Sequence, residues 1–129
     1  MAIQNSLTIT IQQLDATSSR IVNRPFTVTD TLATVGEFRS GTLIDTNQTT
    51  ISLPIAQPRQ ILFKDTHASA KITVVWTPNA GAEVTVCKVG PGGVIALWDP
   101  TAAASGIGIS TLKLTSDVAN ATYELYIGG

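Results

Sequence analysis

The single histidine is the first residue that could support catalysis. His67 lies two residues after Asp65, and the chain has 9 serines, so the residue types of a Ser-His-Asp triad are present. No Gly-x-Ser-x-Gly segment accompanies them, although such a segment exposes the nucleophile in many hydrolases. The polar surroundings of His67 are typical of a loop. We expect Asp65 to accept a hydrogen bond from the backbone N–H two residues on.

The single cysteine and the carboxylates predict no reactive centre. Cys87 lies beside Lys88, but neighbours on a strand point to opposite faces, so we expect Cys87 to pack in the core. One Cys and one His exclude an internal disulfide, a multi-Cys metal site and a paired-His zinc site. The carboxylates show no Asp-x-Asp or EF-hand spacing. They are Asp15, Asp30, Glu37, Asp45, Asp65, Glu83, Asp99, Asp117 and Glu124. We therefore expect no catalytic residue, cofactor or metal.

Two further patterns have a structural and a functional interpretation. The Gly90-Pro91-Gly92-Gly93 segment resembles a phosphate-binding loop, but no Lys or helix follows it, and proline removes one N–H donor. A hairpin turn is the better interpretation. Trp76 and Trp98 could stack against a sugar, yet both lie in strand patterns whose faces indicate core.

The elements that carry these residues are strands. Apolar and polar residues alternate with period two along most of the chain, and helical spacing is hard to find. The alternating segments include 7–12, 71–77, 83–86, 111–115 and 122–127. Shorter strands are expected at 26–28, 31–38, 41–45, 50–53 and 60–64. Turn residues at 78–82 and 90–93 predict a three-strand meander over 71–98.

This spacing of strands and turns predicts an all-β fold. About eight to ten short strands in one domain, residues 1–129, favour an antiparallel, jelly-roll-like β-sandwich, with an up-and-down barrel as the alternative. Residues 1–24 could form an N-terminal arm, because the stretch 15–20 is turn-like and interrupts the pattern. The arm could add its strand, 7–11, to a neighbouring subunit.

Composition excludes several classes of partner. The chain has 129 residues, of which 43% are hydrophobic and only 13% charged, and its net charge is −1. Nucleic acids and anionic membranes bind clustered Lys and Arg, so we expect neither as a partner. The first residues lack a signal-peptide pattern, and no apolar run is long enough to span a membrane. The 19 threonines predict a weakly charged surface. Burying such a surface against another protein has a low desolvation cost, because few ions must be paired.

The segment 60–76, QILFKDTHASAKITVVW, followed by GPGGVIALW at 90–98, resembles small virion proteins of tailed bacteriophages. The resemblance covers about residues 60–127, with a weaker likeness at 41–54. It rests on short strand and turn patterns, so it transfers no functional residue. It implies a head decoration or cement protein that locks neighbouring capsid subunits. It also implies a β-sandwich or jelly-roll oligomer, commonly a trimer.

We therefore expect a non-enzymatic decoration protein of the virion, assembled in the host cytoplasm. Its expected partners are the major capsid protein and copies of itself, as a homotrimer or other homo-oligomer. Candidate interface residues are Leu7, Ile9, Ile11, Trp98 and Tyr126. A receptor- or glycan-binding module from a phage tail or fibre is the alternative and predicts exposed Trp76, Trp98 or Tyr126 around a groove. A small hydrolase that uses His67 is the third.

Overall fold

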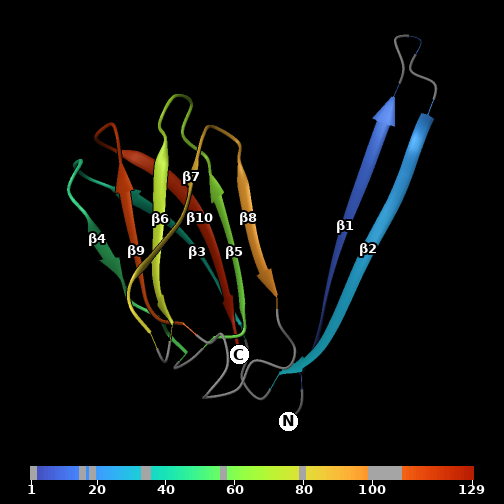
Figure 1. Cartoon of the computed structure of the whole chain (residues 1–129), viewed down its shortest axis with the longest axis horizontal. Coiled ribbons are helices and arrows are strands. Elements are labelled where there is room, and N and C mark those ends of the chain that lie inside the picture. Colours follow the sequence, from blue (N-terminus) through green and yellow to red (C-terminus); the bar gives the residue numbers. More distant parts are fainter. Residues whose placement is uncertain are drawn as a thin grey trace. The chain divides into compact units, whose positions relative to one another are not determined.

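The computed structural model describes residues 3–14, 17, 20–32, 36–55, 58–78, 81–98 and 109–129. The described residues form ten strands and no helix, so the all-β expectation is confirmed (Figure 1). The strands are β1 (Ile3–Leu14), β2 (Arg20–Leu32), β3 (Glu37–Leu43), β4 (Thr49–Ile51), β5 (Gln60–Asp65), β6 (Ile72–Pro78), β7 (Val84–Val89), β8 (Val94–Trp98), β9 (Ile109–Ser116) and β10 (Ala121–Gly128). They fall into two compact units, residues 1–33 and 34–129.

The N-terminal unit is a long two-stranded ribbon. β1 and β2 pair antiparallel from Ile3 opposite Leu32 to Gln13 opposite Val22, and the register shifts before Leu14. The sequence predicted shorter strands here and placed the end of the arm at residue 24. Continuous pairing extends both strands through polar positions that show no apolar alternation. Most of the turn-like stretch 15–20 lies outside the described residues.

The second unit is a β-sandwich. One antiparallel sheet has the order β3-β10-β5-β8 and the other the order β4-β9-β6-β7. The sandwich is confirmed, and the barrel alternative is wrong because the strands form two separate sheets. Buried side chains from both sheets fill the interior, where a Leu, Ile or Phe contributes about 1.5–3 kcal/mol. The largest are Phe63, Leu43, Ile61, Ile72, Ile109, Leu112, Leu114, Leu125 and Ile127.

The strands of the sandwich pair in a nested order. β3 pairs with β10, β4 with β9, β5 with β8, and β6 with β7. Among these eight strands, β6 and β7 are the one consecutive pair within a sheet. The predicted meander over 71–98 is therefore right for β6–β7 and wrong for its last strand. β8 pairs with β5 in the opposite sheet.

The Gly90–Gly93 turn explains why the meander breaks. Gly93 N–H donates to Gly90 O at 2.8 Å, and Gly92 has a φ of 73° after Pro91, as in a type II turn. Type II turns splay the flanking strands, whereas hairpins favour the mirror-image turns. The turn also binds Asp65 at the end of β5, through Gly92 N–H to Asp65 O and Asp65 N–H to Gly93 O, each 3.0 Å. The chain thus crosses to the other sheet.

Hydrogen bonds between loops close this end of the sandwich. Thr66 N–H donates to Thr122 O at 3.1 Å, and Lys71 N–H donates to the Asp117 carboxylate at 2.7 Å. Asn120 N–H donates to Ile44 O at 3.3 Å. These hydrogen bonds connect the loops after β3, β5 and β9, so the polar residues there stabilise the fold.

Candidate interaction surface

The outer face of the β3-β10-β5-β8 sheet carries an apolar row. Side chains alternate along a strand, so Tyr123 and Leu125 of β10 point into the core while Tyr126 points outward. The registers place Phe38, Tyr126, Leu62 and Ala96 opposite one another across all four strands. We call this outer surface the aromatic face. At about 4.8 Å per strand spacing, the row spans roughly 14 Å.

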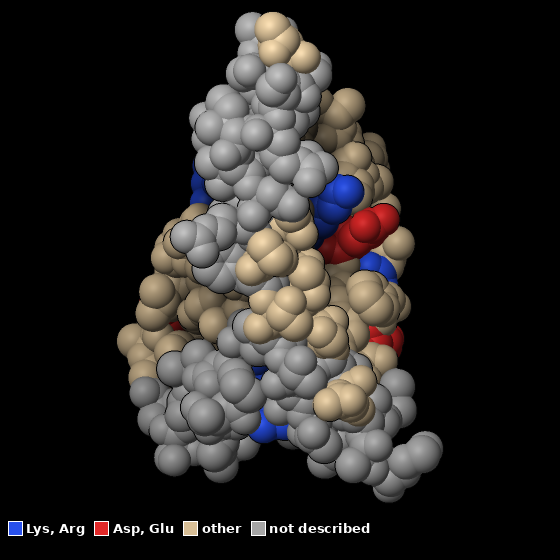
Figure 2. Space-filling view, turned by 90° about the vertical axis from the view of Figure 1, so that its right-hand side faces the viewer, with Lys and Arg blue, Asp and Glu red and all other residues tan. Residues whose placement is uncertain are grey.

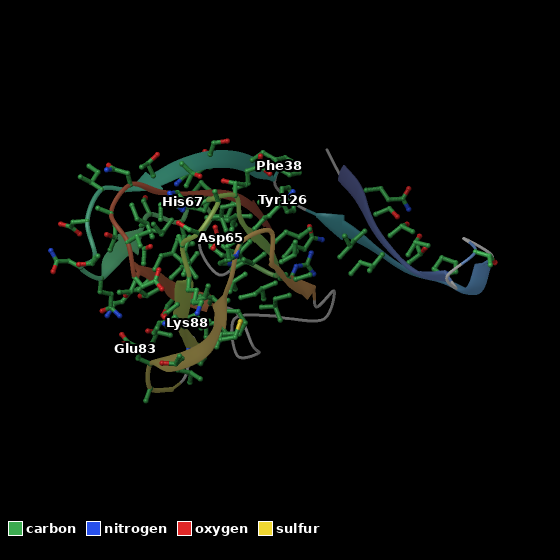
Figure 3. The ribbon with its side chains drawn as sticks, turned by 90° about the horizontal axis from the view of Figure 1, so that it is seen from above. Phe38, Asp65, His67, Glu83, Lys88 and Tyr126 are labelled. Atoms are coloured by element: carbon green, nitrogen blue, oxygen red, sulfur yellow. The ribbon has the colours of Figure 1, made fainter. Side chains whose placement is uncertain are left out.

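Phe38 and Tyr126 form the centre of the aromatic face. Their ring centroids are 4.6 Å apart and the rings are tilted by 42°, and the two side chains lie beside each other in Figure 3. Phe38 is 81% exposed, whereas Tyr126 is buried and donates its hydroxyl hydrogen to Gln60 Oε1 at 3.3 Å. A Cβ at Gly36 would collide with the Tyr126 ring, so this glycine lets the backbone approach it closely. The exposed Phe38 ring therefore packs on the buried Tyr126 ring, which Gln60 holds by a hydrogen bond.

A second row beside the first is mostly polar. Ser40, Glu124, Lys64 and Val94 lie opposite one another in the registers, and Val94 is 59% exposed. An open groove of about 470 Å³ runs over both rows, and Phe38 and Tyr126 are among the residues that line it. An apolar floor with a few polar groups at its side is typical of a surface that binds a partner.

Arg39 ties the edge strand that carries Phe38 to a neighbouring segment. Arg39 donates through Nε to Glu37 Oε1 at 2.6 Å and through a terminal nitrogen to Oε2 at 3.3 Å. It also donates to Ser52 O at 2.7 Å, which ties β3 to the segment after β4. The hydrogen bond from Arg39 holds the pKa of Glu37 below its ordinary value. The hydrogen bond to Ser52 O therefore attaches the strand that presents Phe38, and the Glu37 carboxylate orients Arg39.

The outer face of the β4-β9-β6-β7 sheet is different in character. The registers place mainly threonines and lysines there, and we call it the threonine face. Its described members are Thr50, Thr73, Val75, Thr77, Thr85, Lys88, Thr111, Lys113 and Thr115. Lys113 Nζ donates to Glu83 Oε2 at 2.5 Å. Figure 3 shows Glu83 and Lys88 on the side of the sandwich away from Phe38.

Charged side chains are sparse and mixed in sign. In Figure 2 the coloured Lys/Arg and Asp/Glu side chains are few, and basic and acidic ones lie near one another. The described residues on this side therefore form no patch of one sign.

The Asp65–His67 segment is a turn and holds no triad in the described residues. Asp65 Oδ1 accepts the backbone N–H of His67 at 2.9 Å, which is the predicted local bond. His67 Nδ1 accepts the N–H groups of Ser69 at 3.2 Å and Ala70 at 3.0 Å. The imidazole nitrogen thus closes the loop and is occupied. Asp65 Oδ2 is buried without a partner among the described residues, which contain no group of three or more His, Cys, Asp or Glu able to hold a metal.

The remaining sequence candidates are dispersed. Trp76 and Cys87 pack against the core, as expected. Leu7 and Ile9 lie in the ribbon, where Ile9 is 45% exposed, and Tyr126 lies on the aromatic face. The side chains of Ile11 and Trp98 lie outside the described residues.

Sequence reasoning missed Phe38, Leu62, Val94 and Ala96. A signal was present, because β5 and β8 carry apolar residues at consecutive positions and so on both faces. A strand that is apolar on both faces indicates cover on both sides. Phe38 gave no such signal, since it stands alone among polar neighbours on β3.

Comparison with known proteins found no matching family model, no matching curated protein and no matching solved structure. Within the described residues, the structure contains no helix long and apolar enough to cross a membrane.

Proposed function

We propose that this chain is a non-enzymatic structural protein of a bacteriophage virion that binds the outer shell of the capsid through its aromatic face. In this role it stabilises contacts between subunits of the major capsid protein. The proposal rests on the resemblance of residues 60–127 to small phage virion proteins and on the one-sided surface of the sandwich.

The observation that carries the proposal is the exposed apolar row on one outer face. Phe38 is 81% exposed and packs on Tyr126. When a partner covers such a large apolar side chain, its removal from water stabilises the complex. The adjacent Lys64 and Glu124 provide polar groups at the side of the groove that can set the orientation of a partner. The threonine face has no comparable row among its described residues.

We further propose that the sandwich is a jelly roll. The nested pairing of β3 with β10, β4 with β9, β5 with β8 and β6 with β7 supports this assignment, because it is the pairing of one long hairpin folded into two sheets. The fold presents two broad outer faces, and one of them can dock while the other faces solvent.

Co-sedimentation with heads of the encoding virus tests the function. We expect saturable binding at a fixed ratio to the shell subunits. Phe38→Asp should weaken binding at least about tenfold, because it places a carboxylate in the apolar contact. Thr85→Asp adds the same charge to the threonine face and should bind like the wild type. Absence of saturable binding, or equal binding by both variants, would contradict the proposal.

A second candidate, a glycan- or receptor-binding module of a phage tail or fibre, is favoured by one observation. An exposed aromatic ring beside Ser40, Lys64 and Glu124 offers both stacking and hydrogen bonds to a sugar. Binding of soluble glycans by calorimetry, abolished by Phe38→Ala, would select this function. A few copies per particle, instead of a fixed ratio to the shell, would agree with it.

A further inference from the structure

The aromatic face is complementary in size to a copy of itself. Each of its two edge strands carries one large exposed side chain, Phe38 on β3 and Val94 on β8. At the far end of the same row lies a small, exposed residue, which is Ala96 in the row of Phe38 and Ser40 in the row of Val94. Both rows therefore run from a large side chain to a small one, and they do so in opposite directions across the sheet.

The centre of the aromatic face carries one charge of each sign. Lys64 of β5 and Glu124 of β10 lie opposite each other in the register, and both are exposed. Within the described part of the chain, neither takes part in an ion pair. A partner that presents the same two charges in reverse order would match both of them.

We infer that the aromatic face binds the aromatic face of a second copy of this chain, related by a two-fold axis parallel to the strands. The axis passes between β10 and β5, the two central strands of the sheet. The two sheets then stack with their strands aligned, as the layers of a β-sandwich do. At both edges a large side chain meets a small one. The facing pairs are Phe38 with Ala96 of the partner subunit, Tyr126 with Leu62 of the partner subunit and Val94 with Ser40 of the partner subunit.

The central charges select the position of the axis. Between β10 and β5, the axis places Glu124 opposite Lys64 of the partner subunit, and it does so twice. Moving the axis onto β10 would set two glutamates against each other, and moving it onto β5 would set two lysines against each other. An axis across the strands, along the apolar row, would set the charges against the uncharged positions of Gly128 and Gln60. Charge and side-chain size thus favour the same arrangement.

The size of the face indicates a weak dimer. Four strands at about 4.8 Å spacing and three rows at about 6.7 Å, the third formed by Thr42 and Thr122, give roughly 400 Å² per copy. This area is at the low end of specific interfaces, so we expect a dissociation constant on the order of 100 μM. A capsid and a second copy cannot cover the aromatic face at the same time. That competition rests on the proposed function, whereas the dimer does not.

Sedimentation equilibrium of the full chain, from about 5 to 500 μM, tests the dimer by charge reversal. Wild type should dimerise, and Lys64→Glu or Glu124→Lys should each raise the dissociation constant at least about tenfold, because like charges then face each other. The double variant exchanges the two charges and should dimerise like the wild type. An equimolar mixture of the single variants should form heterodimers, since every facing pair is then opposite in charge. Lys88→Glu makes the same change on the threonine face and should leave the dissociation constant within about twofold.

A second pair of variants tests the match in size. Ala96→Phe places a ring where Phe38 of the partner subunit has to lie, so the dissociation constant should rise at least about fivefold. Thr85→Phe adds the same ring to the threonine face and should have no such effect. If the faces associated only through unspecific apolar contact, the ring at position 96 would tighten the dimer instead.

A monomeric wild type, as expected if another segment of the chain covered the face, would overturn the inference. A trimer, or an oligomer indifferent to both single reversals, would also overturn it, and so would a tighter dimer of Ala96→Phe. Failure of both the double variant and the mixture to recover dimers would contradict it as well. Far-UV circular dichroism on each variant shows whether the strands are retained. The measurement contains no capsid, so its outcome is separate from that of the proposed function.

Discussion

The two outer faces of the sandwich are built on the same strand geometry but differ in what they expose. On the aromatic face, Phe38, Leu62 and Val94 leave apolar atoms in contact with the groove. On the threonine face, short hydroxyl side chains and Lys88 meet solvent, and Val75 is buried at 5% exposure. Threonine satisfies strand preference without offering a large apolar contact. The threonines therefore fit the requirements of the strands alone, whereas the apolar side chains of the aromatic face suit contact with a partner.

The largest expected effect contrasts neighbouring residues of β5 that point to opposite sides. Phe63→Ala empties a core position that is 1% exposed and should lower the free energy of unfolding by about 3–5 kcal/mol. Leu62→Ala, on the half-buried aromatic face, should cost less than about 1.5 kcal/mol. Urea denaturation of both variants measures the contrast. Equal losses would mean that the aromatic face is part of the core.

Gly36→Ala should have the next largest effect. The added Cβ collides with the Tyr126 ring, so we expect a loss of about 1–3 kcal/mol in the free energy of unfolding and weaker packing of Phe38 on Tyr126. Gly90→Ala is the matched control, because nothing lies within 4 Å of its Cβ position. Thermal unfolding and near-UV circular dichroism distinguish the two. A silent Gly36→Ala would show that the Tyr126 ring is free to move.

The ion pair of Lys113 and Glu83 should matter less. Their side chains are 26% and 43% exposed, and solvent screens pairs of this kind. Glu83→Gln should change the free energy of unfolding by less than about 1 kcal/mol, and less still in high salt. Chemical denaturation at two ionic strengths measures this. A loss as large as that of Gly36→Ala would assign the threonine face a structural role that its exposure does not indicate.

The smallest effect concerns acid and the Glu37–Arg39 pair. Because the hydrogen bond from Arg39 lowers the pKa of Glu37 in the folded chain, the unfolded chain binds the proton more tightly. The contribution of the Glu37–Arg39 pair to stability is present above the ordinary glutamate pKa of about 4.3. It is lost as the pH falls through the lower pKa that Glu37 has in the folded chain. Wild type should therefore lose more stability than Glu37→Gln between pH 5 and about pH 3. Parallel losses would show that the pair contributes nothing.

Sequence predicted the strands better than their partners. Alternation in 71–77 and 122–127 marked β6 and β10, because each has an apolar side that faces the core and a more polar outer side. It could not show that β10 lies between β3 and β5, since these pairings join residues about 60 to 90 positions apart. The strand expected at 31–38 spans the boundary of the two units, where β2 ends at Leu32 and β3 begins at Glu37. Local pattern contains no information on that boundary.

The candidate surface was less accessible to sequence than the fold. Tyr126 was expected at an interface, yet the row that surrounds it exists only because four strands distant in sequence share one register. The wrong assignment of β8 to a meander had the same cause. A type II turn at Gly90–Gly93 sends β8 to the sheet of β5, and only that placement brings Val94 and Ala96 beside Leu62.

Side-chain footprinting by hydroxyl radicals, with and without capsids, tests the one-sided docking most directly. Phe38 and Val94 are 81% and 59% exposed on the aromatic face, while Val84 on β7 of the opposite sheet is 47% exposed. All three should be labelled in the free protein. Bound to capsids, Phe38 and Val94 should be protected and Val84 should remain labelled. Protection of Val84 with continued labelling of Phe38 would contradict the account.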